Sequence, residues 1–184
     1  VSIQIDRNTG EILAKEGEHT IDPSELGRIT AQTAKQVIIQ KIREAERDVI
    51  YEDFFSRRGD IVSGTVQRFE GSTIIVNLGK TEGVLQRSEQ IDGEHYNTNE
   101  RVRAIVYDVK KIGARVRILL SRAHPDFVRR LFELEVPEIA ENTIEIKTLV
   151  RDPGHRTKIA VASSDLNVDC VGACVGVRGS RIKN

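Results

Sequence analysis

The sequence contains no methionine and no tryptophan, and aromatic residues make up only 4% of its 184 positions. A core without large rings has to be built from Ile, Val, Leu and Ala, and 39% hydrophobic residues suffice for small globular domains. No apolar run approaches the roughly 18 residues that a membrane-spanning helix needs. The chain start, VSIQIDRNTGEILAK, also lacks the pattern of a signal peptide. We therefore expect a cytoplasmic protein without membrane contact.

Cysteine is scarce, and signatures of catalysis are missing. Cys170 and Cys174 are too few for a disulfide framework, and they supply only two of the four ligands of a structural zinc site. We expect them to pack in a core, because small thiols are often buried. The histidines are scattered, and there is no P-loop, Gly-x-Ser-x-Gly or His-Glu-x-x-His sequence. The sequence therefore predicts no enzymatic activity and no cofactor.

The formal net charge is zero, since 28 Lys and Arg residues balance 28 Asp and Glu residues. A balanced chain is not expected to bind nucleic acid over its whole surface, although the average hides local differences. Basic residues outnumber acidic ones in 59–122 and again in 143–184. We expect local basic patches in these two segments.

The first third of the chain combines a strand pattern with a long helical pattern. Alternation predicts a strand over 2–6, a turn over 7–10, a second strand over 12–13 and another turn over 22–24. From about Thr30, apolar residues recur at helical spacing, which predicts a helix of about six turns with one packed stripe and a solvated charged face. The stripe comprises Ala31, Ala34, Ile38, Ile42, Ala45 and Val49.

From Gly59 the hydrophobic period changes from 3.6 to two, which is typical of strands. The short strand candidates cover 60–67, 74–78, 83–85, 102–107 and 115–121. Five such strands within a short segment favour a small closed barrel. The predicted inward residues are Val62, Val66, Ile74, Val76, Leu78, Val102, Ala104, Val106, Val116, Ile118 and Leu120.

The outer face of this barrel is predicted to carry the basic patch. The alternation places Arg101, Arg103, Arg115 and Arg117 outward, and a predicted turn over 108–114 adds Lys110 and Lys111. In oligonucleotide-binding barrels, the ligand lies over strands 2 and 3 between the first and last hairpin loops. We place Arg68 and Phe69 in the first of these loops and Lys110 and Lys111 in the last.

The same ligand surface is expected to show Ile75 and few rings beyond Phe69 and Tyr107. Because such barrels often stack bases on exposed rings, we expect weak RNA binding that acts mainly through phosphates. The RNA-binding candidates of the barrel are Arg68, Lys110, Lys111, Arg115 and Arg117.

The last third of the chain predicts a helix over 126–134, followed by a hairpin with strands over 144–150 and 158–162. A short helix with Val168, Val171 and Val175 precedes the sequence Gly176-Val177-Arg178-Gly179. We expect 180–184 to open another helix.

A Gly-x-x-Gly turn between two helices can clamp backbone nucleotides in a KH module. Missing β-carbons let the main chain approach phosphates, and the next helix offers free N–H groups. The alternative is a helix cap in which glycine adopts the left-handed conformation. The candidate contacts are Gly176, Val177, Arg178, Gly179, Ser180 and Arg181.

Longer stretches carry a resemblance to a known family. LGRITAQTAKQVIIQKIREAERD (26–48), VPEIAENTIEIKTLVRDPG (136–154), KIAV (158–161) and VGACVGVRGSRI (171–182) closely resemble the NusA family of bacterial transcription factors. The barrel sequences GDIVSGTV (59–66), EGVL (82–85) and LSR (120–122) look like the ribosomal-protein S-one type of oligonucleotide-binding fold.

The resemblance implies an α+β multidomain chain in three parts. Residues 1–58 would be the remnant of an RNA-polymerase-binding domain with a long connecting helix. Residues 59–122 would be a five-stranded OB-fold barrel, and 123–184 an incomplete first KH domain of type II.

The resemblance also implies a monomeric, non-enzymatic elongation factor that modulates pausing, termination and antitermination. Its partners would be RNA polymerase, single-stranded nascent RNA, and other elongation or antitermination factors. Gly176 and Gly179 would clamp the RNA backbone, and Arg178 and Arg181 would contact phosphates.

Two other functions stay open at this point. An accessory region of a phosphorolytic exoribonuclease also joins KH and barrel modules, although there the KH module comes first. A protein-interaction scaffold with vestigial RNA surfaces would also fit the zero net charge.

Overall fold

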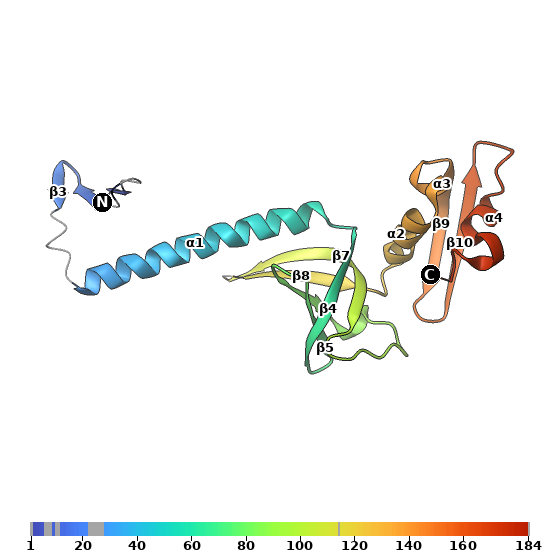
Figure 1. Cartoon of the computed structure of the whole chain (residues 1–184), viewed down its shortest axis with the longest axis horizontal. Helices are drawn as coiled ribbons and strands as arrows, with labels where there is room; N and C mark the ends of the chain where they lie inside the picture. The colour runs from blue at the N-terminus through green and yellow to red at the C-terminus, as the bar shows by residue number, and fades with distance from the viewer. Residues whose placement is uncertain (1, 6–8, 10–11, 22–27, 114, 184) are drawn as a thin grey trace. The chain divides into compact units, whose positions relative to one another are not determined.

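A computed structural model describes residues 2–5, 9, 12–21, 28–113 and 115–183. The chain has an α+β fold, as predicted (Figure 1). Its contacts divide it into two compact units, 1–46 and 47–184. The division into three parts at residues 58 and 122 stays a prediction. In the described part, no helix is long and apolar enough to cross a membrane.

The first unit contains a three-stranded antiparallel sheet in the order β1-β2-β3. The strands are β1 (Ser2–Ile5), β2 (Ile12–Glu16) and β3 (His19–Ile21), and the last of these was not predicted. The predicted turn residues 7, 8, 10 and 22–24, the last residue of the predicted strand 2–6, and residue 184 lie outside the described residues.

Helix α1 (Arg28–Ser56) is longer than predicted and continues into the second unit. The prediction of a packed apolar stripe is wrong, because Ile38, Ile42 and Val49 are 43%, 53% and 68% exposed. Instead, Phe54 is buried in the barrel core near the end of the helix. Helical spacing predicts that a stripe exists, but it does not say which turns have a partner.

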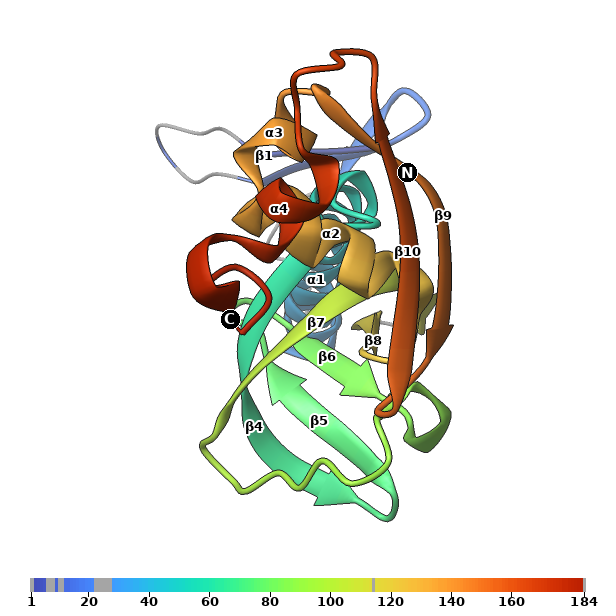
Figure 2. The same cartoon turned by 90° about the vertical axis from the view of Figure 1, so that its right-hand side faces the viewer.

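The second unit begins with a closed five-stranded barrel in the order β4-β5-β6-β8-β7 (Figure 2). All neighbouring pairs are antiparallel except β6 and β8. The predicted inward residues are buried, apart from the partly buried Leu78, so the predicted barrel is confirmed. The strands are β4 (Ile61–Glu70), β5 (Thr73–Asn77), β6 (Glu82–Leu85), β7 (Arg101–Ile112) and β8 (Arg115–Ser121).

Two glycines allow the barrel strands to approach closely. A β-carbon on Gly64 would lie 2.4 Å from Val76 Cγ1 and 2.7 Å from the Asn77 carbonyl oxygen. A β-carbon on Gly83 would lie 2.6 Å from Leu120 Cδ1. These distances leave no room for a methyl group, so the barrel core requires glycine at both positions.

Strands β4 and β7 extend further than predicted, and each contains a register shift near its predicted end. The shifts lie between Val66 and Arg68 and between Val106 and Asp108, and both strands continue beyond them. The residues that were predicted to lie in the two hairpin loops therefore lie in strands. The prediction missed this because a bulge interrupts strict alternation. The residues affected are Arg68, Phe69, Lys110 and Lys111.

The C-terminal part forms the predicted hairpin, with β9 (Ile144–Asp152) antiparallel to β10 (Arg156–Ser163). Cys174 is buried in the core between this hairpin and the helices, as predicted. Residues 180–183 form turns rather than the predicted helix. The helices are α2 (Pro125–Glu135), α3 (Pro137–Ala140), α4 (Cys170–Val175) and the 3-10 turn η3 (Val177–Gly179).

Arg122 joins the barrel to the C-terminal part. Its Nε and Nη2 atoms donate to the Glu94 carboxylate at 2.7 and 2.5 Å, and its guanidinium lies 5.1 Å from the centre of the Phe127 ring in α2. Burial acts to raise the pKa of Glu94, but the bonds from Arg122 and Tyr96 outweigh it, so this pKa is lowered. Arg151 of β9 lies 5.6 Å from the same ring. This cluster fixes α2 and β9 against the barrel.

We predict that Gly64→Ala destabilises the barrel, because the added methyl group meets Val76 and the Asn77 carbonyl. The free energy of unfolding should fall by about 1 to 3 kcal/mol in urea denaturation. Ser63→Ala, at an exposed position of the same strand, is the control and should change it by less than about 0.5 kcal/mol. Equal stability of the two variants would contradict the close packing at Gly64.

Candidate nucleic-acid interface

A groove of about 260 Å³ crosses the outer face of the barrel over β4, β5, β6 and β8. The strand register sets one row of neighbours across this face, in which Ile75 pairs with Arg68 on one side and with Val84 on the other. The groove is lined by Arg68, Glu70, Thr73, Ile75, Glu82, Val84, Gln86, Arg115, Val116 and Arg117.

The floor of the groove is apolar but scarcely exposed. Ile75, Val84 and Leu119 form a small buried cluster against Tyr107 on the outer face. Ile75 is only 4% exposed, so the expectation that it shows on the ligand surface is wrong. Register explains the burial, because apolar residues of neighbouring strands fall side by side and cover one another. Ligand contacts in this groove must therefore come mainly from its polar rim.

Arg68 stands in the rim, but carboxylates already surround it. Its Nη1 and Nη2 atoms donate to the two Glu82 oxygens at 2.8 and 3.1 Å, and its Nε donates to Glu70 at 2.8 Å. These bonds raise the pKa of the Arg68 guanidinium above its usual value. The charge of this predicted phosphate contact is thus neutralised by its neighbours.

Arg115 and Arg117 line the same groove without such partners. Both side chains are exposed, and neither makes a hydrogen bond or an ion pair among the described residues. The bonds from Arg68, together with the positive charges of Arg115 and Arg117, lower the pKa of Glu82. These two arginines are therefore the cations that the groove can offer to an anionic ligand.

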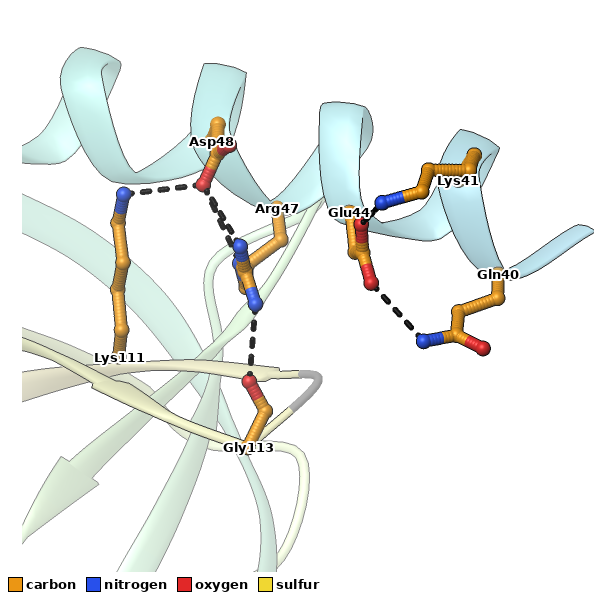
Figure 3. Close-up of polar contacts among 7 residues, drawn as sticks. All are labelled: Gln40, Lys41, Glu44, Arg47, Asp48, Lys111 and Gly113. Atoms are coloured by element: carbon orange, nitrogen blue, oxygen red, sulfur yellow. Dashed lines mark hydrogen bonds and ion pairs between the residues drawn. The ribbon is translucent and has the colours of Figure 1, made fainter. Parts of the chain in front are cut away.

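The predicted lysines are not part of the groove lining. After the bulge in β7, Lys110 pairs with Arg117 on the outer face and lies 3.7 Å from Asp108. Lys111 points toward α1, where its Nζ lies 2.9 Å from Asp48 (Figure 3). The same Nζ lies 4.3 Å from the centre of the Tyr51 ring. The structure does not bring Lys110 and Lys111 together with the three arginines in one groove.

Asp48 joins α1 to the hairpin of β7 and β8 (Figure 3). It accepts bonds from Lys111 and from Arg47, which lower the pKa of its carboxyl group. Arg47 also donates to the Gly113 carbonyl oxygen at 3.2 Å. Lys111 thus has a structural role at this contact.

The glycine turn of the C-terminal part has a constrained backbone. Gly176 ends α4 with φ 73° and ψ 168°, and Arg178 and Gly179 also have positive φ angles. A β-carbon on Gly176 would lie 2.8 Å from Arg181 Cγ and 3.1 Å from the Arg181 nitrogen. The turn therefore requires glycine at 176. Gly176 caps α4, but its ψ differs from that of the left-handed helical cap in the alternative prediction.

The two arginines of this turn differ in their partners. Arg181 donates from Nη1 to the Ala173 carbonyl oxygen at 2.6 Å and to Glu138 Oε2 at 2.9 Å. Arg178 is exposed beside the 83% exposed Val177, and it has no bonding partner in the described part. Ser180 is exposed and follows in helical conformation. Arg178 is thus available to a ligand, whereas Arg181 holds α3 and α4 together.

Sequence reasoning missed the acids that accompany the predicted cations. Glu82 was recognised only as part of a family-like sequence, and Asp48 only as part of a helix. Both lie far along the chain from the cations they bind, 14 residues from Arg68 and 63 from Lys111. Opposite charges on one face of the barrel could have indicated that Glu82 pairs with a cation. The bulge in β4 changes the register of Arg68, so the sequence pattern did not show that the two residues are neighbours.

The geometry defines a modular chain, with a barrel that carries an arginine-lined groove followed by an α/β part with a glycine turn. Residues 122–184 match the NusA-like first KH domain, and residues 1–48 match the NusA N-terminal domain. The chain belongs to the NusA family.

Curated relatives agree with this family. A protein of Halalkalibacterium halodurans is 49% identical over 166 residues, which cover 90% of this chain, and one of Bacillus subtilis is 46% identical over the same length. One of Mycobacterium bovis is 40% identical over 200 residues, covering 99% of this chain. All three are named transcription termination/antitermination protein NusA, and the chain spans 44%, 45% and 58% of their lengths.

We predict that Arg181→Gln lowers the melting temperature by several degrees, because it breaks bonds to Ala173 and Glu138. Arg178→Gln, the matched control three positions away, should leave the melting temperature unchanged because Arg178 has no bonding partner in the described part. Thermal denaturation followed by circular dichroism measures both. Equal melting temperatures would show that Arg181 does not hold the two helices.

Proposed function

We propose that this chain takes part in the regulation of transcription elongation, pausing, termination and antitermination, by binding RNA polymerase and single-stranded nascent RNA. The proposal is carried by the family membership, since relatives aligned over most of the chain are named for termination and antitermination. In this proposal the chain acts in the cytoplasm as a monomer, without catalysis, and other elongation or antitermination factors join it.

The proposal assigns separate tasks to three parts. Residues 1–58 dock on RNA polymerase, in line with the match of 1–48 to the NusA N-terminal domain. Residues 59–122 act as an OB-type barrel, and 123–184 act as a type II KH domain. The exposed apolar residues of α1 are consistent with a protein partner for the first part.

RNA contact is proposed to rest on the unpaired arginines. Arg115 and Arg117 offer two guanidinium groups in the groove, and guanidinium binds phosphate through paired hydrogen bonds. Arg178 and the main chain from Gly176 to Gly179 offer a second contact on the KH turn. The scarcely exposed floor of the groove supports weak binding through phosphates rather than base stacking.

The test is binding of a labelled oligoadenylate of roughly 20 nucleotides, longer than the site of a single barrel. Arg115→Gln/Arg117→Gln should weaken binding and reduce the slope of log affinity against log salt by about 1.4, because two phosphate contacts are lost. Titrations between about 50 and 200 mM salt measure the slope. The fold of the variant is checked by circular dichroism.

A matched control is Arg57→Gln/Arg58→Gln, which removes two positive charges outside the groove lining. This control should keep most of the affinity and the slope. An equal loss in both double variants would mean that only overall charge matters, and it would contradict a binding groove.

Gly179→Asp tests the turn separately. The added carboxylate should repel phosphate and weaken binding of the same oligoadenylate. A β-carbon on Gly179 would make only ordinary contacts, the nearest at 3.5 Å to Lys183 Cε, so folding should stay intact apart from the strain of the positive φ. Gly179→Asn, with a similar shape and no charge, is the control. Unchanged binding by the Asp variant would remove the turn from the RNA site. Capture of RNA polymerase by a chain that binds no RNA would favour the scaffold alternative.

A further inference from the structure

The arginine-lined groove contains acids as well as cations, although its proposed ligand is an anion. Glu82 and Glu70 line it together with Arg68, Arg115 and Arg117. A carboxylate in a phosphate-binding groove lowers the affinity for nucleic acid, because like charges repel. Glu82 therefore opposes RNA binding in the groove that is proposed to bind RNA.

Glu82 engages the end of Arg68, where arginine side chains bind anions. Its two oxygens accept two bonds from the end of Arg68, at 2.8 and 3.1 Å. This fork is the geometry with which arginine binds either a carboxylate or a phosphate. The positive charges of Arg115 and Arg117 also favour the ionised form of Glu82. All three arginines of the groove thus act on Glu82, whereas Glu70 accepts a bond from Arg68.

The pair of Arg68 and Glu82 can be opened by a competing anion. The two side chains are 42% and 44% exposed, so water screens the pair and each group can be rehydrated when it separates. Exposed ion pairs contribute little to stability. By contrast, the backbone of β6 cannot move away with Glu82, because Gly83 next to it is packed against Leu120 in the barrel core. Displacement therefore requires only a rotation of the Glu82 side chain.

We infer that Glu82 is a built-in competitor for the phosphate site of the barrel: an RNA phosphate binds Arg68 only by displacing the Glu82 carboxylate, so Glu82 sets the affinity of the groove. This inference rests on the proposed RNA binding by the barrel. A short anion makes too few contacts to displace Glu82. An RNA strand that also reaches Arg115 and Arg117 gains enough contacts to open the pair of Arg68 and Glu82.

The direct test is Glu82→Gln in the whole chain, with the same oligoadenylate. The affinity should rise by roughly threefold to tenfold, the size of one charge-assisted contact, because a phosphate no longer has to displace a carboxylate from Arg68. The control Glu52→Gln removes the same charge from an exposed position of α1 outside the groove lining. It should change the affinity by less than about twofold, because a distant charge is screened by salt.

A double-mutant cycle then links the gain to Arg68. In an Arg68→Gln background, Glu82→Gln should no longer raise the affinity, because the contact that Glu82 blocks is gone. A gain that persists without Arg68, or one that Glu52→Gln reproduces, overturns the competitor role. A loss of affinity in Glu82→Gln also overturns it and makes the pair a structural clamp.

One measurement needs no variant. The carboxyl carbon NMR signal of Glu82 in the unmodified chain should move toward the value of a solvated glutamate when oligoadenylate is added. An unmoved signal with RNA bound overturns the inference. If the chain binds no RNA in any form, both the proposed function and the inference fail. If Arg115→Gln/Arg117→Gln weakens binding while Glu82→Gln matches its control, only the inference fails.

Discussion

The closure of the barrel by the parallel pairing of β6 with β8 is the constraint on which the candidate site depends. Gly83 makes this pairing possible, since any side chain there would overlap Leu120. Closure brings Glu82, at the start of β6, into the groove that Arg115 and Arg117 of β8 line. The pairing of β4 with β5 adds Arg68 on the other side. Residues from three strands thus meet on one outer face because the barrel is closed.

Once the strands are in place, ion pairing decides which cations can act on a ligand. Arg68, Lys111 and Arg181 each bind a carboxylate of the chain itself. Two of these pairs hold elements together, α1 with the β7 hairpin and α3 with α4. Arg115, Arg117 and Arg178 make no such pair in the described part, and they lie in the groove and on the glycine turn. This division fits a chain with zero net charge that is proposed to bind RNA weakly and locally.

The alternation of Ile, Val and Leu was enough to predict the barrel and the C-terminal hairpin, because burial on one face fixes the period. The bulges at Gln67 and Tyr107 could not be predicted, since the break that an extra residue makes in the alternation looks the same as the end of a strand. Because the bulges were missed, Arg68 and Lys111 were predicted to lie in loops, and the acids that bind these cations were not recognised. The family resemblance was readable from long stretches of sequence, and it is confirmed. The prediction that the apolar stripe of α1 is packed was wrong, because amphipathic spacing does not identify a surface against which the stripe could pack.

The central claim is that RNA lies in the groove of the barrel and on the glycine turn. Photocrosslinking of a thiouridine-containing single-stranded RNA to the whole chain, followed by mass spectrometry of the crosslinked peptides, tests it most directly. The account predicts crosslinks within 68–86, within 115–117 and within 176–179. Crosslinks confined to α1, or a chain that forms none, would contradict it.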